Sequence, residues 1–206
     1  MVEIVEREAD PANSPVDGRA ARRQRNIEHV LDVVIDMFVD ESMFPTMEQV
    51  ATRSGLSLRS LYRYFAEPTE LLEAAIARTG RMGRDAAHLP SIGQGPLERR
   101  IDDFVTMRLR IHDAVGAVFR ATVVNAPRSQ RVRDQLTIAR DELRRQFEAQ
   151  FAPEIASLRG AERDGVVSAG DLLTQLESID FLRRHRRCSV AETSTALATG
   201  LRALFG

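Results

Sequence analysis

The stretch 46–65, TMEQVATRSGLSLRSLYRYF, constrains the fold of this 206-residue chain more than any other. Thr46 is a favoured N-cap residue, and Gln49 completes a capping box three positions later, so a short helix is predicted to follow Thr46 directly. Gly55 can adopt the positive φ that ends a helix, and Ser57 can cap a second helix that runs to Phe65. Because the connection is so short, the two helices must cross at a steep angle, which predicts a helix-turn-helix.

The two predicted helices of this stretch have an apolar side and a polar side. The side chains expected to pack inward are Val50, Ala51, Leu56, Leu61 and Phe65. Those expected to face outward are Leu58, Arg59, Ser60, Tyr62, Arg63 and Tyr64. Arginine can pair with guanine and leucine can contact the methyl group of thymine, so the outward face predicts contacts in a DNA groove. The alternative is an ordinary helical hairpin whose arginines are only solvated.

From about residue 22 to about residue 72 the chain resembles the TetR-type family of transcriptional regulators. The most specific match is the run GLSLRSLYRYF, followed by a new helix at Pro68. The resemblance implies an all-α homodimer, in which an N-terminal three-helix helix-turn-helix DNA-binding domain precedes an α-helical ligand-binding and dimerisation domain. Members of the family bind palindromic operators and release them when a small molecule enters the C-terminal domain.

The resemblance also implies which side chains touch DNA. Thr46 and Tyr64 would contact phosphates, whereas Leu58, Arg59, Ser60 and Tyr62 would approach bases. The complete expected set is Arg22, Arg23, Thr46, Ser57, Leu58, Arg59, Ser60, Tyr62, Arg63 and Tyr64.

One position departs from the family pattern. The second helix of the helix-turn-helix, expected to run from Ser57 to Phe65, is called the reading helix below. Many relatives have a lysine at the start of the helix that follows it, and this lysine holds a phosphate. Here Pro68 stands at that point, with Glu67 and Glu70 beside it. The resemblance therefore does not carry this phosphate contact over to the chain.

The distribution of charge supports a nucleic-acid partner only locally. The whole chain has a net charge of −1 and a pI of about 6.5, so it has no global excess of positive charge. Residues 19–25, however, carry four arginines and no acid. This run can be a solvated helix start, but in the family such an arm contacts backbone phosphate or enters the minor groove, which favours Arg22 and Arg23 as DNA contacts.

The patterns divide the chain into three parts. Residues 1–18 contain two prolines and several acids without a helical period, which predicts a disordered tail. We expect residues 19–67 to form the DNA-binding domain and residues 68–206 to form the effector-binding and dimerisation domain. The apolar content of 43% is enough for a buried core.

Nothing in the sequence indicates export or membrane insertion. Cys188 is the single cysteine, which excludes an internal disulfide and fits a reducing compartment. No apolar run approaches the roughly 18 residues that a membrane helix needs, and the acidic N-terminus lacks the basic segment of a secretory signal. We expect a cytoplasmic protein.

Apolar residues at three- and four-residue spacing predict further helices on both sides of the reading stretch. The first covers 27–38, supports the helix-turn-helix and ends at 42–45. The later elements are expected in this order: a helix from Pro68, a loop over 88–95, one or two helices over 96–126, a helix over 132–151, a loop over 160–165, a helix that Ser168 begins, and a last helix with a capping box at Ser189 and Glu192.

The pattern over 96–126 is the candidate effector site. Arg108 and His112 interrupt an otherwise apolar stripe, either as a partly exposed edge or satisfied core pair, or as polar groups in a ligand cavity. Apolar walls with a few polar groups suit a small, mostly apolar molecule. The expected effector-binding residues are Phe104, Met107, Arg108, His112, Phe119, Thr122 and Asn125.

The last two helices are the expected dimer surface, because they carry apolar residues on more than one side and small residues that allow close approach. The expected interface residues are Leu172, Leu176, Ile179, Ser194, Leu197 and Leu201. The arginines of the run 182–188, LRRHRRC, are interpreted as charges at a helix C-terminus rather than as a second DNA site.

Two other functions compete with a regulator. An enzyme is disfavoured, because the four histidines are scattered and the sequence has no HExxH, no CxxC and no glycine-rich phosphate loop after a strand. The sequence accordingly predicts no cofactor and no metal site. The second rival is a helical regulator or adaptor that has lost effector response or DNA binding. The resemblance implies repression, and the sequence identifies neither the effector nor the operator.

Overall fold

The computed structural model of the chain describes residues 15–40 and 45–206, and every regular element in these ranges is a helix. The all-α prediction is therefore confirmed. None of these helices is long and apolar enough to cross a membrane. The elements are α1 (Pro15–Asp40), α2 (Met47–Ser54), α3 (Leu58–Tyr64), α4 (Pro68–Ala86), α5 (Leu97–Asn125), η2 (Ala126–Arg128), α6 (Gln130–Gln150), α7 (Ala152–Ser157), α8 (Gly160–Thr174), α9 (Leu176–Asp180), η3 (Phe181–His185) and α10 (Val190–Phe205).

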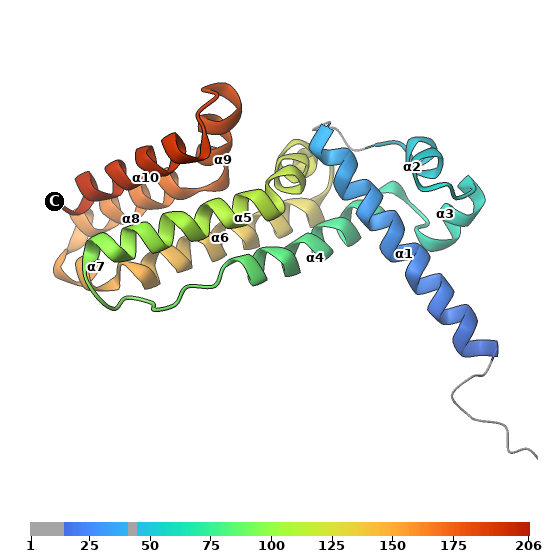
Figure 1. The fold of residues 1–206 in the computed structure, drawn as a ribbon, viewed down its shortest axis with the longest axis horizontal. Helices are drawn as coiled ribbons and strands as arrows, with labels where there is room; N and C mark the ends of the chain where they lie inside the picture. Colours follow the sequence, from blue (N-terminus) through green and yellow to red (C-terminus); the bar gives the residue numbers. More distant parts are fainter. Residues whose placement is uncertain (1–14, 41–44) are drawn as a thin grey trace, which may run out of the picture.

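The first three helices form a small head at one end of the molecule (Figure 1). The apolar stripe of α1 supplies the fully buried Val30 and Val34, and α2 and α3 supply Val50 and Leu61. These side chains are brought together because each helix buries its apolar face against the other two. The predicted role of the first helix as the support of the helix-turn-helix is confirmed.

The predicted bounds of the disordered tail, 1–18, extend too far along the chain. Residues 1–14 lie outside the described residues, but 15–18 belong to α1. Pro15 can begin a helix because its fixed φ suits the first turn and its missing N–H would have no intrahelical acceptor there. The expected end of this helix at 42–45 falls mostly on 41–44, which also lie outside the described residues.

The body is built around α5, a single helix of 29 residues where the sequence allowed one or two. It contacts α4, α6, α9 and α10, so most of its circumference is covered (Figure 1). Helix α4 joins the head to this body. Arg78 of α4 pairs with Asp32 of α1, and Glu73 of α4 pairs with Arg131 of α6.

The segment 160–174 differs from the prediction. The expected loop 160–165 is the beginning of α8, because Gly160 turns the chain with a φ of 54° and the next residues include the good helix formers Ala161, Glu162 and Arg163. Ser168 therefore lies inside α8 and does not cap it. The backbone becomes extended at Gln175, so the expected single helix is two, α8 and α9.

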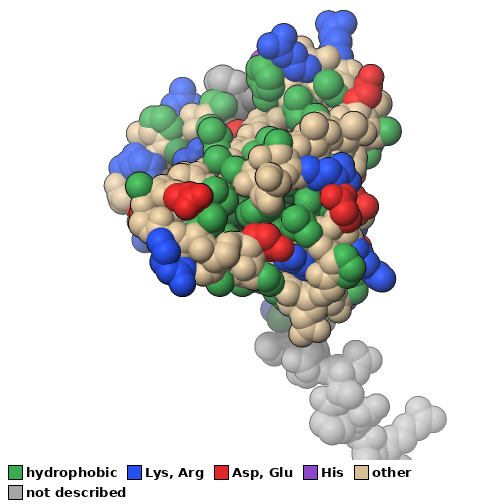
Figure 2. Space-filling model, turned by 90° about the vertical axis from the view of Figure 1, so that its left-hand side faces the viewer, with side chains coloured by type: hydrophobic (Ala, Val, Ile, Leu, Met, Phe, Trp, Pro, Cys, Tyr) green, Lys and Arg blue, Asp and Glu red, His purple; other side chains and the backbone are tan. Residues whose placement is uncertain are grey.

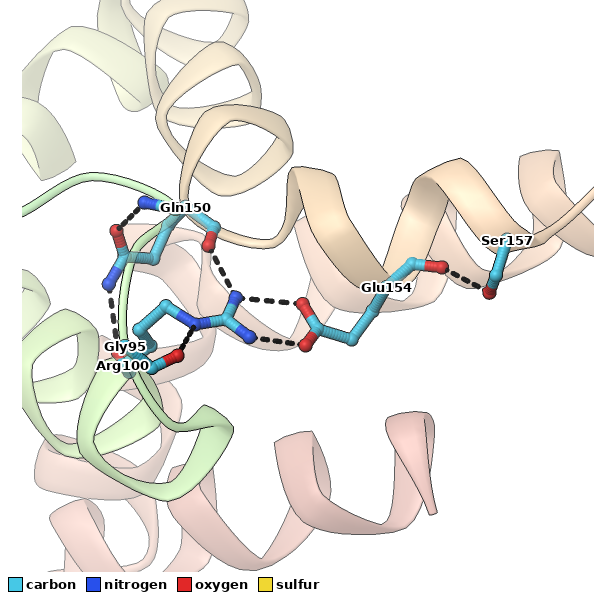
Figure 3. A network of polar contacts seen from close by, with 6 residues as sticks. Gly95, Arg100, Gln150, Glu154 and Ser157 are labelled. Carbon is cyan, nitrogen blue, oxygen red and sulfur yellow. Dashed lines mark hydrogen bonds and ion pairs between the residues drawn. The ribbon is translucent and has the colours of Figure 1, made fainter.

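The end of the body away from the head is held by a buried ion pair (Figure 3). Arg100 is 4% exposed and binds both carboxylate oxygens of Glu154. Its guanidinium also donates to the carbonyl oxygens of Gln150, at 2.9 Å, and Gly95, at 3.1 Å. One side chain therefore ties the loop before α5, the end of α6 and the short α7 together. On the surface at this end, charged side chains of both signs lie among and around the apolar ones (Figure 2).

We expect Glu154→Gln to lower the free energy of unfolding by about 3 kcal/mol at neutral pH, because it removes one partner of a buried pair. The hydrogen bond from Arg100 lowers the pKa of Glu154. Its contribution is thus complete above the ordinary glutamate pKa of 4.5 and is lost as the pH falls through the lower folded-state pKa.

Urea unfolding curves measured between neutral and acidic pH check this expectation. The stability difference between the wild type and Glu154→Gln should narrow below about pH 4.5. Glu148→Gln is the matched control, because Glu148 pairs with the partly exposed Arg144 and should contribute less than about 1 kcal/mol. Equal losses in the two variants would contradict a special role for the buried pair.

Candidate nucleic-acid interface

The helix-turn-helix is built from three local signals, and the structure confirms each prediction. The backbone N–H of Gln49 donates to the Thr46 hydroxyl at 3.3 Å, and the Thr46 N–H donates to the Gln49 side chain at 2.7 Å. Gly55 ends α2 with a φ of 69°. The Ser57 hydroxyl accepts from the N–H of Ser60 at 3.2 Å and so begins α3.

The two faces of α3 also separate as predicted. Leu61 and Phe65 are buried in the head, and Leu56 is half-buried before the helix. Arg59 and Arg63 are exposed, and Tyr62 is 43% exposed despite its size. The outward face of α3 therefore presents cationic and aromatic groups to the outside, and α3 has no acidic residue.

Tyr64 is held at the junction between α3 and α1. The amide nitrogen of Asn26 donates to the Tyr64 oxygen at 3.0 Å, and Arg63 donates to the same oxygen at 3.5 Å. The guanidinium carbons of Arg23 and Arg63 lie 5.8 and 5.4 Å from the ring centroid. The bond from Asn26, then that from Arg63, lowers the pKa of Tyr64. The hydroxyl hydrogen is left for another acceptor, and a phosphate oxygen would suit it.

The arginines of 19–25 extend this surface along α1. Arg19, Arg22, Arg23 and Arg25 are all exposed in the N-terminal part of the helix. All four lie within α1, and of the four it is Arg23 that lies over the Tyr64 ring. Arg23 thus connects the basic run to the reading helix.

Two residues of this site were not predicted. Asn26 orients Tyr64, and the ring of His29 donates a hydrogen bond from Nε2 to the carbonyl oxygen of Ser54 at 3.2 Å, which fastens α1 to the end of α2. Asn26 and Tyr64 are 38 positions apart, so no local pattern in the sequence connects them.

The acidic residues next to Pro68 have a structural explanation. Pro68 is the first residue of α4, and Glu70 in the first turn accepts a hydrogen bond from the N–H of Ala66 at 2.7 Å. A carboxylate in this position is stabilised by the positive end of the helix dipole. Part of the negative charge beside the reading helix is therefore already compensated.

A cavity of about 370 Å³ lies between α4, α5 and α6. Thr122, Gln135, Glu142 and Arg145 are among its polar lining residues. Its apolar lining consists of Ile76, Ala77, Ile111, Val115, Val118, Phe119, Leu136, Ile138, Ala139, Leu143 and Leu176. We call this the apolar cavity.

Three of the expected effector residues line a cavity. Phe119 and Thr122 belong to the apolar cavity. His112 lies instead in a second cavity of about 350 Å³ between α5, α9 and η3, which it shares with Phe119. Whether these side chains contact a ligand stays a prediction.

The expectation that the other four line the ligand cavity is wrong. Phe104 and Met107 are fully buried in the chain's own core, where Phe104 packs edge-on against two other phenylalanines. Arg108 is 1% exposed, donates to the Leu143 carbonyl and lies 4.5 Å from the Phe104 ring centroid. Burial lowers the pKa of Arg108 to about 9, which leaves it charged at neutral pH. Asn125 donates to the Ala121 carbonyl and so closes the end of α5.

The expected dimer surface needs a similar correction. Leu176, Ile179, Leu197 and Leu201 are buried within the single chain, because α9 and α10 press them against α5 and α8. They cannot be contact residues of a dimer in this conformation. Leu172, at 71% exposed, and the half-exposed Ser194 face outward.

No family model and no curated protein match the chain. The solved structures similar to it include a TetR-family transcriptional regulator from Streptomyces coelicolor. That protein is 25% identical in sequence, and the superposition covers 88% of this chain and 80% of the other with a TM-score of 0.64. The chain therefore has a TetR-like fold.

The exposure of Arg59 on the outward face of α3 generates a prediction. Arg59→Ala should weaken binding to a specific operator by about 1 to 3 kcal/mol and relax the preference at one base of each half-site, because the side chain would lose its contact with a base edge. Affinities for a panel of single-base operator variants measure both effects. Arg163→Ala, an exposed arginine of α8, is the control and should bind like the wild type. An equal loss on every sequence would make Arg59 a phosphate contact.

Proposed function

We propose that this chain is a DNA-binding transcriptional regulator, a repressor that binds a palindromic operator as a dimer and is released by a small-molecule effector. The observation that carries the proposal is the outward face of α3, where Arg59, Tyr62 and Arg63 are exposed beside Tyr64. The TetR-family regulator with the same fold supports it. An adaptor that has lost DNA binding would have no need for this acid-free surface, so we favour the regulator.

The outer faces of α8 and α10 are the proposed dimer surface. The two helices lie side by side (Figure 1), and their exposed residues include the large apolar side chains of Leu172 and Val190. Ala169 of α8 and Ala196, Thr199 and Ala203 of α10 are exposed on the same pair. Small side chains let helices approach closely, and an exposed leucine among them gains from burial by a second copy. A two-fold dimer would place two α3 helices about 34 to 36 Å apart, one turn of the duplex.

We expect Leu172→Arg to produce a monomer that has lost specific operator binding, because each monomer reaches only one half-site. Ile92→Arg is the matched control, since Ile92 is also an exposed apolar residue but lies in the loop before α5. The operator is obtained by sequencing genomic DNA that co-purifies with the wild type, and it should be an inverted repeat.

Sedimentation and gel retardation on the same samples test the dimer proposal. A Leu172→Arg protein that stays dimeric would move the interface elsewhere. A wild-type monomer that binds the operator tightly would refute the dimer itself. Leu197 and Leu201 are unsuitable for this test, because charges at these buried positions would unfold the chain.

The apolar cavity is the proposed effector site. Helix α4 supplies Ile76, Ala77 and Gly80 to its wall, and the same helix is tied to α1 by the pair of Arg78 with Asp32. A ligand that displaces α4 would therefore displace the head. The lining favours a small, mostly apolar molecule.

We expect an apolar compound that raises the melting temperature to lower operator affinity by a factor of about 5 to 150, and the operator to lower the affinity for the compound by the same factor. Ala139→Phe should abolish both effects while leaving operator binding intact, since it fills the cavity from α6. Fluorescence anisotropy with labelled operator measures the coupling. A compound that stabilises the protein without changing DNA affinity would contradict it.

A further inference from the structure

The second cavity lies next to the apolar cavity, on a neighbouring face of α5. Helix α5 supplies His112, Arg120 and Val123, and α9 with η3 supplies Glu177, Asp180 and Phe181, among others. The two cavities have only Phe119 and Leu176 in common. The second cavity is therefore a separate space with a different chemical lining, and we call it the His112 cavity.

Buried polar atoms without a hydrogen-bond partner gather at the His112 cavity. Within the described ranges there are seven such side-chain atoms, and four belong to its lining: both ring nitrogens of His112, Nε of Arg120 and Oε2 of Glu177. Native proteins pair nearly all buried polar atoms, because leaving one unpaired destabilises the fold. Such a concentration at one cavity indicates a site whose polar groups are completed by a bound molecule.

The polar side chains of the cavity have hydrogen-bond partners for only some of their atoms. Arg120 donates from Nη1 to Asp180 at 2.7 Å, and Glu177 accepts through Oε1 from Arg140 at 2.6 Å. The ring of His112 is 11% exposed, and its Nε2 lies 3.5 Å from Asp180 without the geometry of a hydrogen bond. Each group thus has at least one buried hydrogen-bonding atom without a partner.

The backbone of α5 makes room for the His112 ring. Gly116 is a buried glycine in the interior of a long helix, where alanine is normally more stable. A Cβ atom at this position would lie 3.2 Å from both Cδ2 and Nε2 of His112. Alanine at position 116 would therefore push the ring, whereas glycine lets it rest on the helix.

The lining specifies the chemistry of the molecule. The two carboxylates of the lining, Glu177 and Asp180, are each paired with an arginine, so an ion entering the cavity would find no unbalanced counter-charge. No group of three or more His, Cys, Asp or Glu residues in the described part of the chain could hold a metal ion. The unpaired atoms include donors and an acceptor, and a hydroxyl group can serve both kinds. Phe119, Val123 and Phe181 supply apolar and aromatic walls.

We propose that the His112 cavity binds an uncharged aromatic compound with hydroxyl groups. The hydroxyls accept from Arg120 Nε and donate to Glu177 Oε2, and His112 contacts them through a ring nitrogen. The aromatic ring packs against Phe119 and Phe181. Hydrogen bonds to otherwise unpaired buried groups make such a site discriminate strongly against an analogue that lacks the hydroxyls.

Methyl NMR on the full chain with catechol as the probe tests the proposal. Catechol should bind saturably and shift the methyl signals of Val123 and Val124, which line the His112 cavity. Benzene has the ring without the hydroxyls and should shift Ile76 and Ile138 of the apolar cavity instead. Catechol that shifts only the apolar-cavity signals, or that shows no saturation, overturns the proposal.

Variants assign the effect to the polar groups. His112→Phe keeps an aromatic ring and should weaken catechol binding at least about tenfold, because the nitrogen contacts are lost. His88→Phe changes an exposed histidine outside the cavity and should leave the affinity unchanged. Glu177→Gln keeps the shape of a partly exposed side chain and provides a second variant if His112→Phe does not fold. Wild-type affinity in folded His112→Phe or in Glu177→Gln overturns the assigned contacts.

Discussion

The structure depends on the way that two buried arginines of α5 fix this helix against α6. Arg100 donates to the carbonyl oxygen of Gln150, and Arg108 donates to that of Leu143. Each guanidinium must find acceptors because it is almost wholly removed from water, and carbonyl groups at the end of α6 and about two turns before it supply them. Because these two contacts join α5 and α6 in antiparallel order at fixed positions, they allow only one axial register between the two helices. That register decides which side chains of α5 face α4 and α6, and hence where the apolar cavity lies.

The parts of the fold that the sequence predicts are those set by short-range chemistry. Thr46, Gly55, Ser57 and Ser189 end or begin helices through bonds to residues a few positions away, so each could be recognised without knowing the tertiary structure. The outward face of α3 was predictable for the same reason. Where a local signal was ambiguous, as at Gly160, the prediction of a loop was wrong, because a glycine can turn the chain and still be followed at once by a helix.

The parts that escaped prediction depend on contacts between distant segments. An apolar stripe shows that Leu197 and Leu201 are buried, but not whether a second copy or the same chain buries them, and here it is the same chain. Arg108 looked like a ligand group because its acceptors lie on another helix, more than thirty positions away. The pairing of Asn26 with Tyr64 was hidden in the same way. Periodicity reports burial, whereas the identity of the neighbour comes only from the tertiary structure.

The bonds that join α1 to the two helices of the reading motif have a mechanical consequence. Asn26 holds α3 through Tyr64, and His29 holds the end of α2 through the Ser54 carbonyl, so the head is braced from one helix at two points. A shift of α4 would carry this braced unit as a lever and leave the shape of its reading face unaltered. Signalling through α4 would thus change the affinity of the head for DNA without changing its base preference. The two properties could then vary independently in related chains.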